Sequence, residues 1–419
     1  MDKLEVFGAR KLKGSVRISG SKNAALPILA ASILSNKKII LNNFPNLKDT
    51  KTMIKLLESI GSVIKYSKKK NSITIQNKNK IKTFASYNLV KTMRAGILVL
   101  GPMLARYGKA KVSTPGGCSI GVRPIDIHLK ALAKLGINYK IVDGYVYANS
   151  KKKLKGAKIK FPKISVGATE NLIIASSMAE GTTILSNCAI EPEIKDLVNF
   201  INCIGGKIKW IGKRTIKITG VKSFNKAEYK IMPDRIEAGT YLIAAAVTEG
   251  NLKISGINPN IIKTEIDILK KIGMQIKTKK ELIIISGNNN VKNISLKTAP
   301  YPGFPTDLQA QLMVLLCKSK KHSVIKEEIF ENRFMHCAEL NRMGAKIKTK
   351  GNKAFIEGNI KFKGAELMAT DLRASVSLII AGLAAQGKTT INRIYHLDRG
   401  YEKIEKKLRK VGAKIRRVS

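Results

Sequence analysis

The sequence lacks the features that mark membrane-spanning, disulfide-bonded and metal-binding proteins. No apolar run reaches the roughly 18 residues that a membrane helix needs, and the first ten residues, MDKLEVFGAR, have no signal-peptide core. The five cysteines are odd in number and widely spaced without a CxxC pair, and the four histidines show no HExxH spacing. These absences exclude a membrane span, a disulfide framework and a dedicated metal site. We therefore expect a protein of the reducing cytoplasm.

Acidic residues are also scarce, since 29 Asp and Glu face 77 Lys and Arg, for a formal charge of +48. Such a charge raises the possibility of a nucleic-acid partner. The 62 lysines are scattered rather than clustered, however, and neither an RNP-like aromatic motif nor a zinc finger accompanies them. We attribute the excess to lysines that fill solvated positions, as in AT-rich genomes, and expect no nucleic-acid partner. A retained arginine in such a chain suggests a position that needs a forked donor.

A chain of 419 residues is long enough for two domains, and this one repeats itself. An apolar-Gly-x-x-apolar signature ends a charged helix and begins a strand six times. Its glycines are Gly61, Gly136, Gly205, Gly273, Gly344 and Gly412. Each glycine stands where a left-handed helix C-cap is expected. Six units of about seventy residues therefore fill the chain.

Each unit reads as strand, buried helix, strand, exposed helix and two strands. The alanine-rich segments 170–179, 236–247 and 372–385 are apolar nearly all round, which predicts buried helices. The charged segments 49–59 and 262–271 predict helices on the outside. The sixth unit lacks its last strand, and an extra strand opens the chain. We expect the N-terminal strand to complete the sixth unit, so that both chain ends share one domain.

The segment TPGGCSIGVRP, residues 114–124, is the most distinctive stretch. Gly116 and Gly117 precede Cys118 and leave the backbone free to approach a ligand. Arg123 places a fixed positive charge near the thiol, which favours a thiolate or a bound anion. A reactive cysteine and a buried structural cysteine in a glycine turn are both compatible with this local pattern.

Other polar segments interrupt the repeats. Lys22 and Asn23, in SGSKNAALP, occupy a strand-to-helix turn that either binds an anion or simply caps a helix. KISVGAT, residues 163–169, is a second such turn. Asp307 follows Pro305 at a predicted helix start, where an N-cap is the simpler interpretation. Further charged residues stand in KTMRAG, ENRFMH, ATDLRAS and LDRGYEK, namely Arg94, Arg333, Asp371, Arg373 and Arg399.

Taken together, these segments resemble the UDP-N-acetylglucosamine enolpyruvyl transferase (1-carboxyvinyltransferase) family over essentially the whole chain. The segments that carry the resemblance are SGSKNAALPIL, PGGCSIGVRP, FPTDLQAQ, FENRFMH, MATDLRAS and YHLDRGYE. No motif position departs from the family pattern, and the differences lie at lysine-rich surface positions.

The resemblance implies an α/β fold of two similar domains. Each domain has three repeated βαβαββ-like units around buried helices, the "inside-out" α/β barrel of enolpyruvyl transferases. The implied boundaries are residues 22–232 for the domain with the catalytic loop and residues 1–21 plus 233–419 for the second. The oligomeric state does not follow from the sequence.

The implied activity is that of a transferase of peptidoglycan precursor synthesis, and so of cell wall biogenesis, cell shape, the cell cycle and cell division. The enolpyruvyl group of phosphoenolpyruvate moves to the 3′-hydroxyl of UDP-N-acetylglucosamine, and phosphate leaves. Cys118 is the implied acid and covalent residue, and Asp307 is the implied base. No cofactor, metal or membrane partner is implied.

The resemblance also implies which residues bind the substrates. Phosphoenolpyruvate is held by Lys22, Arg123 and Arg399. The UDP-sugar is contacted or positioned by Asn23, Arg94, Arg123, Pro124, Ile125, Asp126, Ile127, Lys163, Ile164, Ser165, Val166, Asp307 and Ile329. The residues Arg333, Asp371 and Arg373 line the site.

Three alternatives stay open at this point. A related enolpyruvyl transferase acts on shikimate 3-phosphate and shares the six-unit fold, although the PGGCSIGVRP loop belongs to the UDP-sugar enzymes. An RNA-binding protein is suggested by charge alone. A purely structural repeat protein leaves the polar loop residues without a purpose.

Overall fold

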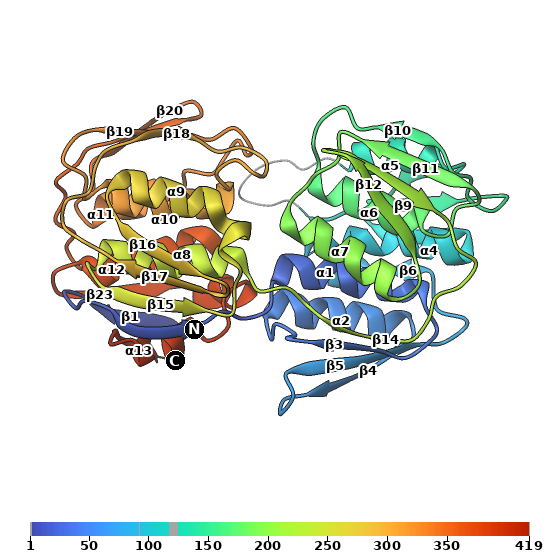
Figure 1. Ribbon diagram of the computed structural model, residues 1–419, viewed down its shortest axis with the longest axis horizontal. Helices are drawn as coiled ribbons and strands as arrows, with labels where there is room; N and C mark the ends of the chain where they lie inside the picture. Colours follow the sequence, from blue (N-terminus) through green and yellow to red (C-terminus); the bar gives the residue numbers. More distant parts are fainter. Residues whose placement is uncertain (1, 92, 117–124, 419) are drawn as a thin grey trace. The chain divides into compact units, whose positions relative to one another are not determined.

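The computed structural model describes residues 2–91, 93–116 and 125–418. The described residues divide into two compact units, which Figure 1 shows with their helices and strands. We call residues 20–116 and 125–232 the first unit, and residues 2–19 and 233–418 the second unit. Each contains three four-stranded sheets around buried helices, which confirms the predicted fold class. None of the described helices is long and apolar enough to cross a membrane.

The three sheets of the first unit share one strand pattern. Their strand orders are β14 (Ala227–Lys230), β3 (Ile39–Asn42), β5 (Ser72–Asn77), β4 (Ser62–Ser67); β6 (Phe84–Ala85), β7 (Lys109–Ser113), β9 (Tyr145–Asn149), β8 (Asn138–Val142); and β10 (Lys158–Lys160), β11 (Thr182–Ser186), β13 (Thr215–Thr219), β12 (Lys207–Gly212). The helices are α1 (Lys22–Ala31), η1 (Ser32–Leu34), α2 (Lys48–Ile60), α3 (Tyr87–Val90), η2 (Arg94–Val99), α4 (Leu100–Tyr107), α5 (Asp126–Ala133), α6 (Val166–Ser176) and α7 (Pro192–Cys203).

The second unit repeats the pattern. Its strand orders are β16 (Gln275–Lys279), β17 (Leu282–Ser286), β15 (Asn251–Ser255), β2 (Lys13–Arg17); β18 (Ser295–Lys297), β19 (Ser323–Lys326), β21 (Lys353–Ile356), β20 (Ile347–Lys350); and β22 (Glu366–Met368), β23 (Lys388–Asn392), β1 (Lys3–Phe7), β24 (Lys414–Val418). The helices are α8 (Arg235–Val247), η3 (Pro259–Ile262), α9 (Lys263–Ile272), η4 (Thr306–Leu308), α10 (Gln309–Leu316), α11 (His336–Arg342), α12 (Leu372–Ala384), η5 (Ile394–Arg399) and α13 (Ile404–Lys410).

Three sheets take one strand from a distant part of the sequence. β1 lies between β23 and β24 and is antiparallel to both, so the first residues of the chain supply the strand that the sixth repeat lacks. β2 pairs in parallel with β15, and β14 pairs in parallel with β3. The strand before α1 therefore belongs to the second unit, and a strand from the fourth repeat completes the first sheet.

The six repeat glycines all have positive φ, as the C-cap prediction requires. Their φ values are 116° at Gly61, 94° at Gly136, 103° at Gly205, 112° at Gly273, 92° at Gly344 and 97° at Gly412. A side chain with a Cβ rarely adopts this conformation. Each glycine thus ends one outer helix and turns the chain into the next hairpin.

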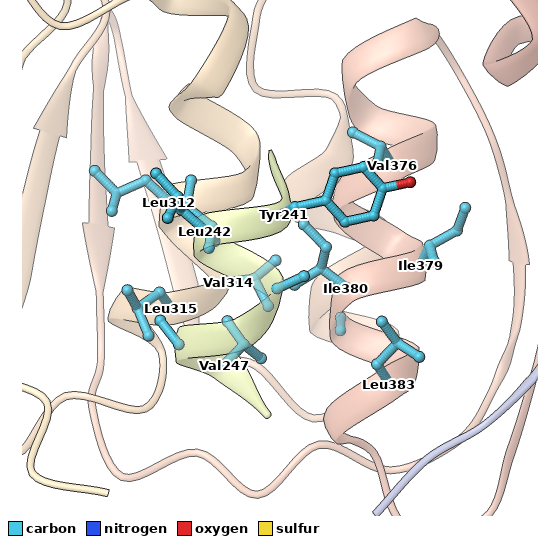
Figure 2. Close-up of a cluster of buried hydrophobic side chains, with 14 of the residues drawn as sticks. Tyr241, Leu242, Val247, Leu312, Val314, Leu315, Val376, Ile379, Ile380 and Leu383 are labelled. Atoms are coloured by element: carbon cyan, nitrogen blue, oxygen red, sulfur yellow. The ribbon is translucent and has the colours of Figure 1, made fainter. Parts of the chain in front are cut away.

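The alanine-rich helices form the core, as predicted. In the second unit, α8, α10 and α12 pack against one another with apolar side chains between them (Figure 2). Tyr241 and Leu242 of α8, Leu312 of α10, and Val376 and Ile380 of α12 are all buried there. Truncating one such large side chain to alanine typically costs about 2–5 kcal/mol. This packing fixes the N-terminal ends of the three helices, where the charged motif residues stand.

Candidate active site

Three arginine and aspartate residues predicted for the site meet in the second unit. Arg333 donates from Nη2 to Oδ1 of Asp307 at 2.9 Å, and Arg373 donates from Nη2 to Oδ2 at 2.7 Å. Both arginine side chains are buried, at 6% and 5% exposure, whereas the Asp307 side chain is 26% exposed. The carboxylate is therefore anchored by buried cations and still reachable from outside.

The N-cap interpretation of Asp307 is wrong. Asp307 lies inside η4, and the N-cap residue of that helix is Pro305. An ionised carboxylate offers about four acceptor positions, and the two arginines occupy one on each oxygen. The Asp307 side chain is 26% exposed, so a hydroxyl can reach this carboxylate from outside, as a general base requires.

Arg373 has a second hydrogen-bond partner besides Asp307. Its Nη1 donates to the hydroxyl of the buried Tyr401 at 3.1 Å. Burial is the largest single influence on the pKa of Arg373 and would lower it, but the charge and hydrogen bond of Asp307, together with the neighbouring acidic groups Tyr401 and Asp234, raise that pKa overall. Arg373 is therefore a permanent cation whose two amino groups are committed to two different partners.

Asp371 starts the helix that carries Arg373. As the N-cap of α12, its Oδ1 accepts from the backbone N–H groups of Arg373 at 2.8 Å and Ala374 at 3.0 Å. The nearby His336 is fully buried, and burial lowers its pKa to about 4 although Asp371 acts in the opposite direction. The imidazole is thus neutral at physiological pH and adds no charge beside Arg333.

Glu327 organises the neighbouring segment, although it was not predicted as a site residue. Its Oε1 accepts from Thr298 Oγ1 at 2.8 Å and from the backbone N–H groups of Ile329 and Phe330 at 2.9 and 3.2 Å. Its Oε2 accepts from Thr306 Oγ1 at 2.8 Å. One buried carboxylate thereby links the residue before Asp307 to the loop that leads to Arg333.

Two further predicted residues of this unit lie nearby in the fold. Ile329 is half-buried, and Glu327 fixes its backbone. Arg399 is the last residue of η5, is half-buried, and belongs to an element that packs against α12. The structure thus joins Asp307, Arg333 and Arg373 by direct contact and places Ile329 and Arg399 on adjoining segments.

In the first unit, the predicted residues stand at the starts of helical segments. Lys22 and Asn23 open α1 after the N-cap Ser21, whose Oγ accepts from Ala24 N at 3.3 Å. Lys22 Nζ lies 3.2 Å from Oδ2 of Asp49, and both side chains are largely buried. Asp49 stands in the first turn of α2, where an acidic residue is ordinary, so its sequence position alone gives no signal of this contact.

The remaining predicted residues of this unit fall into three groups. Arg94 opens η2, and η2 packs against both α1 and α6. Lys163 and Val166 are exposed, and Ile164 and Ser165, the N-cap of α6, are partly buried. Ile125 is the N-cap of α5, Asp126 is exposed, and Ile127 is buried in the core. The starts of α5 and α6 touch, since a Cβ at Gly167 would lie 3.1 Å from His128 Cε1.

His128 connects these two helix starts. Its Nδ1 lies 3.2 Å from Nδ2 of Asn171. An amide nitrogen can only donate, so Nδ1 is the acceptor and the ring carries its proton on Nε2. Burial lowers the pKa of His128 to about 4, against a smaller effect of Asp126. The neutral imidazole of His128 is therefore part of the packing between the starts of α5 and α6, where the predicted substrate residues stand.

The predicted residues Cys118, Arg123 and Pro124 lie outside the described residues. The four described cysteines are free. Burial raises the pKa of Cys188 and of Cys337 to about 12 and raises that of Cys317 as well, whereas Cys203 is exposed. Within the described ranges, no three His, Cys, Asp or Glu side chains gather in a way that could hold a metal ion.

Comparisons with known proteins bear on this arrangement. Residues 6–408 match the model of the EPSP synthase (3-phosphoshikimate 1-carboxyvinyltransferase) family. The fold is similar to that of the enolpyruvyl transferase NikO from Streptomyces tendae, with a TM-score of 0.89, 23% identity, and coverage of 100% of this chain and 99% of that one. The fold and the family match together define an enolpyruvyl transferase.

Two curated relatives narrow the assignment. The UDP-N-acetylglucosamine 1-carboxyvinyltransferase of Pelagibacter ubique (strain HTCC1062) is 70% identical over 419 residues, with full coverage of both chains. The enzyme of the same name from Coxiella burnetii (strain Dugway 5J108-111) is 50% identical over 420 residues, covering 100% of this chain and 96% of that one. The chain belongs to the UDP-N-acetylglucosamine 1-carboxyvinyltransferase family, and the resemblance inferred from the motifs is confirmed.

Proposed function

We propose that this enzyme transfers the enolpyruvyl group of phosphoenolpyruvate to the 3′-hydroxyl of UDP-N-acetylglucosamine, with Asp307 as the base and Cys118 as the acid. Family membership supports the assignment of the overall reaction, which is a step of peptidoglycan precursor synthesis. The observation that carries the role of Asp307 is its carboxylate, partly exposed between two buried guanidinium groups.

The chemistry is an addition followed by an elimination. The sugar 3′-oxygen attacks C2 of phosphoenolpyruvate while C3 accepts a proton from the Cys118 thiol. Asp307 takes the proton of the attacking hydroxyl. In the tetrahedral intermediate, the Cys118 thiolate takes a proton back from C3, the double bond re-forms, and the C2–O bond to phosphate breaks so that phosphate leaves with that electron pair. Phosphate and the enolpyruvyl ether are the products.

Arg333 and Arg373 give Asp307 its orientation in this proposal. Each donates to a different carboxylate oxygen, so the carboxylate plane is fixed before substrate arrives. Such pre-organisation lowers the cost of aligning base and hydroxyl. Asp371 supports the same arrangement by fixing the first turn of α12.

The substrate contacts are assigned by resemblance. Lys22, Arg123 and Arg399 are proposed for the phosphate and carboxylate of phosphoenolpyruvate, which need cationic partners. Asn23, Arg94, the segments 123–127 and 163–166, and Ile329 are proposed for the UDP-sugar. The positions of Lys22, Asn23 and Ser165 at helix starts support anion binding, because free backbone N–H groups point outward there.

The decisive experiment measures phosphate release with phosphoenolpyruvate and each of two acceptors. Release with UDP-N-acetylglucosamine, and none with shikimate 3-phosphate, is the expected result. The reverse preference would assign the chain to the activity in the name of the matched family model. Release without any acceptor would indicate a hydrolase and contradict the proposal. We place the reaction in the cytoplasm, which the free thiols of the four described cysteines support.

A further inference from the structure

We propose that Tyr401 is a positioning residue for the base, acting on Asp307 through Arg373. This proposal rests on the role of Asp307 proposed above. Tyr401 is 2% exposed, and it follows η5 rather than standing in any of the three core helices. Its hydroxyl nevertheless lies within hydrogen-bond distance of all three helices at the end where Asp307 stands.

The contacts of this hydroxyl bring the three helices together. It lies 2.8 Å from Thr240 Oγ1 on α8, 3.4 Å from Gln311 Nε2 on α10, and 3.1 Å from Arg373 Nη1 on α12. Gln311 Nε2 also donates to the backbone oxygen of Asp307 at 2.9 Å. A single phenol therefore connects the helix that carries Arg373 to the segment that carries Asp307.

The protons in this network have one consistent arrangement. Thr240 donates its hydroxyl proton to the backbone oxygen of Ile236 at 2.8 Å, so Thr240 Oγ1 must accept from Tyr401. The oxygen of Tyr401 then presents its lone pairs to Arg373 and Gln311, which can only donate through these nitrogens. Burial raises the pKa of Tyr401, and Arg373 opposes this to a smaller extent. The phenol keeps its proton at physiological pH, and the arrangement holds.

The orientation of the Tyr401 hydroxyl explains why Arg373 directs one amino group at Tyr401 and the other at Asp307. Nη1 is anchored by Tyr401, and Nη2 is left to meet Asp307 Oδ2 at 2.7 Å. Without the tyrosine oxygen, a buried guanidinium N–H loses its acceptor. Such a group reorients to find another partner, because an unsatisfied buried donor is costly. The reorientation would move Nη2 away from the base.

Tyr241 provides a matched control one residue along α8 from Thr240. It is fully buried, and its hydroxyl has no hydrogen-bond partner within the described residues. Figure 2 shows it among the apolar side chains of α8 and α12. Tyr241→Phe and Tyr401→Phe remove the same atom from the same core, but only the second removes a contact to Arg373.

The experiment compares steady-state kinetics of the parent, Tyr401→Phe, Tyr241→Phe, Asp307→Asn and the double variant Tyr401→Phe/Asp307→Asn. Tyr401→Phe should lower kcat at least about 10-fold with little change in either KM, because it misplaces the base rather than a binding group. Tyr241→Phe should keep the parent rate.

The double variant decides whether Tyr401 acts through Asp307. In the Asp307→Asn background, Tyr401→Phe should lower the residual rate by less than about 2-fold, because residues that act as one unit are not additive. A full 10-fold loss in that background, or a Tyr401→Phe enzyme with the parent kcat, would overturn the proposal. A parent that releases no phosphate from the two substrates would instead refute the proposed function itself.

Discussion

Arg373 donates a 2.7 Å hydrogen bond to Asp307 across 66 positions of sequence. The two residues belong to consecutive repeats, at the starts of α12 and α10. Arg333 adds a second bond from the loop between them. The three-residue cluster therefore forms only when the repeats pack, and it gives the enzyme a carboxylate whose position is set by buried charge.

Replacing Asp307 by Asn separates a catalytic from a structural role. An amide cannot take the 3′-hydroxyl proton, so kcat should fall by about 10²–10⁴-fold. Stability should fall by about 1–3 kcal/mol, because two buried arginines lose their counter-charge. Asp267→Asn is the control, since Asp267 pairs with Lys263 on the surface. Steady-state kinetics and urea unfolding measure both effects, and an Asp307→Asn enzyme with the parent kcat would leave the base unassigned.

Cys118 should be the only cysteine needed for turnover. Cys118→Ser should abolish phosphate release, whereas serine at position 188, 317 or 337 should mainly lower stability, because those thiols are buried. Their raised pKa values keep them protonated and poorly nucleophilic at pH 7–8. Iodoacetamide followed by peptide mass spectrometry should modify Cys118 and the exposed Cys203 before the others. Full turnover in Cys118→Ala would contradict the assignment.

The first unit should lose stability on acidification through His128. Its folded pKa of about 4 is below the unfolded value of 6.5, so the unfolded state binds the proton more tightly between these values. Stability is then fully present above pH 6.5 and is lost as the pH falls toward 4, by about 3 kcal/mol. His128→Gln should remove most of this dependence.

Trp210 offers the readout for that experiment, because it is the only tryptophan of the chain and lies in β12 of the same unit. Urea unfolding followed by its fluorescence at pH 7 and pH 5 gives the difference. His322→Gln is the control, because His322 is exposed and lies in the second unit. An unchanged pH dependence in His128→Gln would contradict the prediction.

Glu327→Gln should weaken binding of the UDP-sugar more than it slows chemistry. The amide nitrogen cannot accept the hydrogen bonds that Glu327 receives from Thr306 Oγ1 or from Ile329 N, so the loop that carries Ile329 is held less firmly. We expect KM for the UDP-sugar to rise about 10-fold, which corresponds to the loss of about one hydrogen bond to a charged group. Glu328→Gln, at the exposed neighbour, should stay within about 2-fold of the parent. An unchanged KM in Glu327→Gln would remove Glu327 from substrate binding.

Much of the fold was predictable because its signals are local. The helix-ending glycines need a positive φ whatever surrounds them, and all six have it. The alanine-rich segments 236–247 and 372–385 form α8 and α12 within one residue of the predicted bounds. Hydrophobic periodicity indicates which face of a helix or strand is buried, and it can be read without knowing which element packs against that face.

The partner strands were less predictable. The pairing of β1 with β24 could be inferred from a missing strand, but the exchange that pairs β2 with β15 and β14 with β3 had no such signal. The parallel partner of such a strand is far away in the sequence and is determined by tertiary packing. The short strands themselves have little intrinsic preference for one partner over another.

The site shows the same division between local and distant information. The motifs around Asp307 and Arg373 marked these residues as chemically important, yet the local pattern favoured a helix cap for Asp307, and that interpretation was wrong. A signal for Glu327 was present and was not used, since the alternation of β19 places it on the buried face after Ser323 and Ile325. Tyr401 had none.

The sequence by itself thus determined the elements, the repeats, the family and the identity of the charged motif residues, because each depends on neighbours along the chain. Only the tertiary structure decided which charges pair. Whether Asp307 caps a helix or holds two arginines depends on side chains from Arg333 and Arg373, which other loops and helices deliver. Ion pairs and buried hydrogen bonds act over a few ångströms in space, and packing of distant repeats sets those distances.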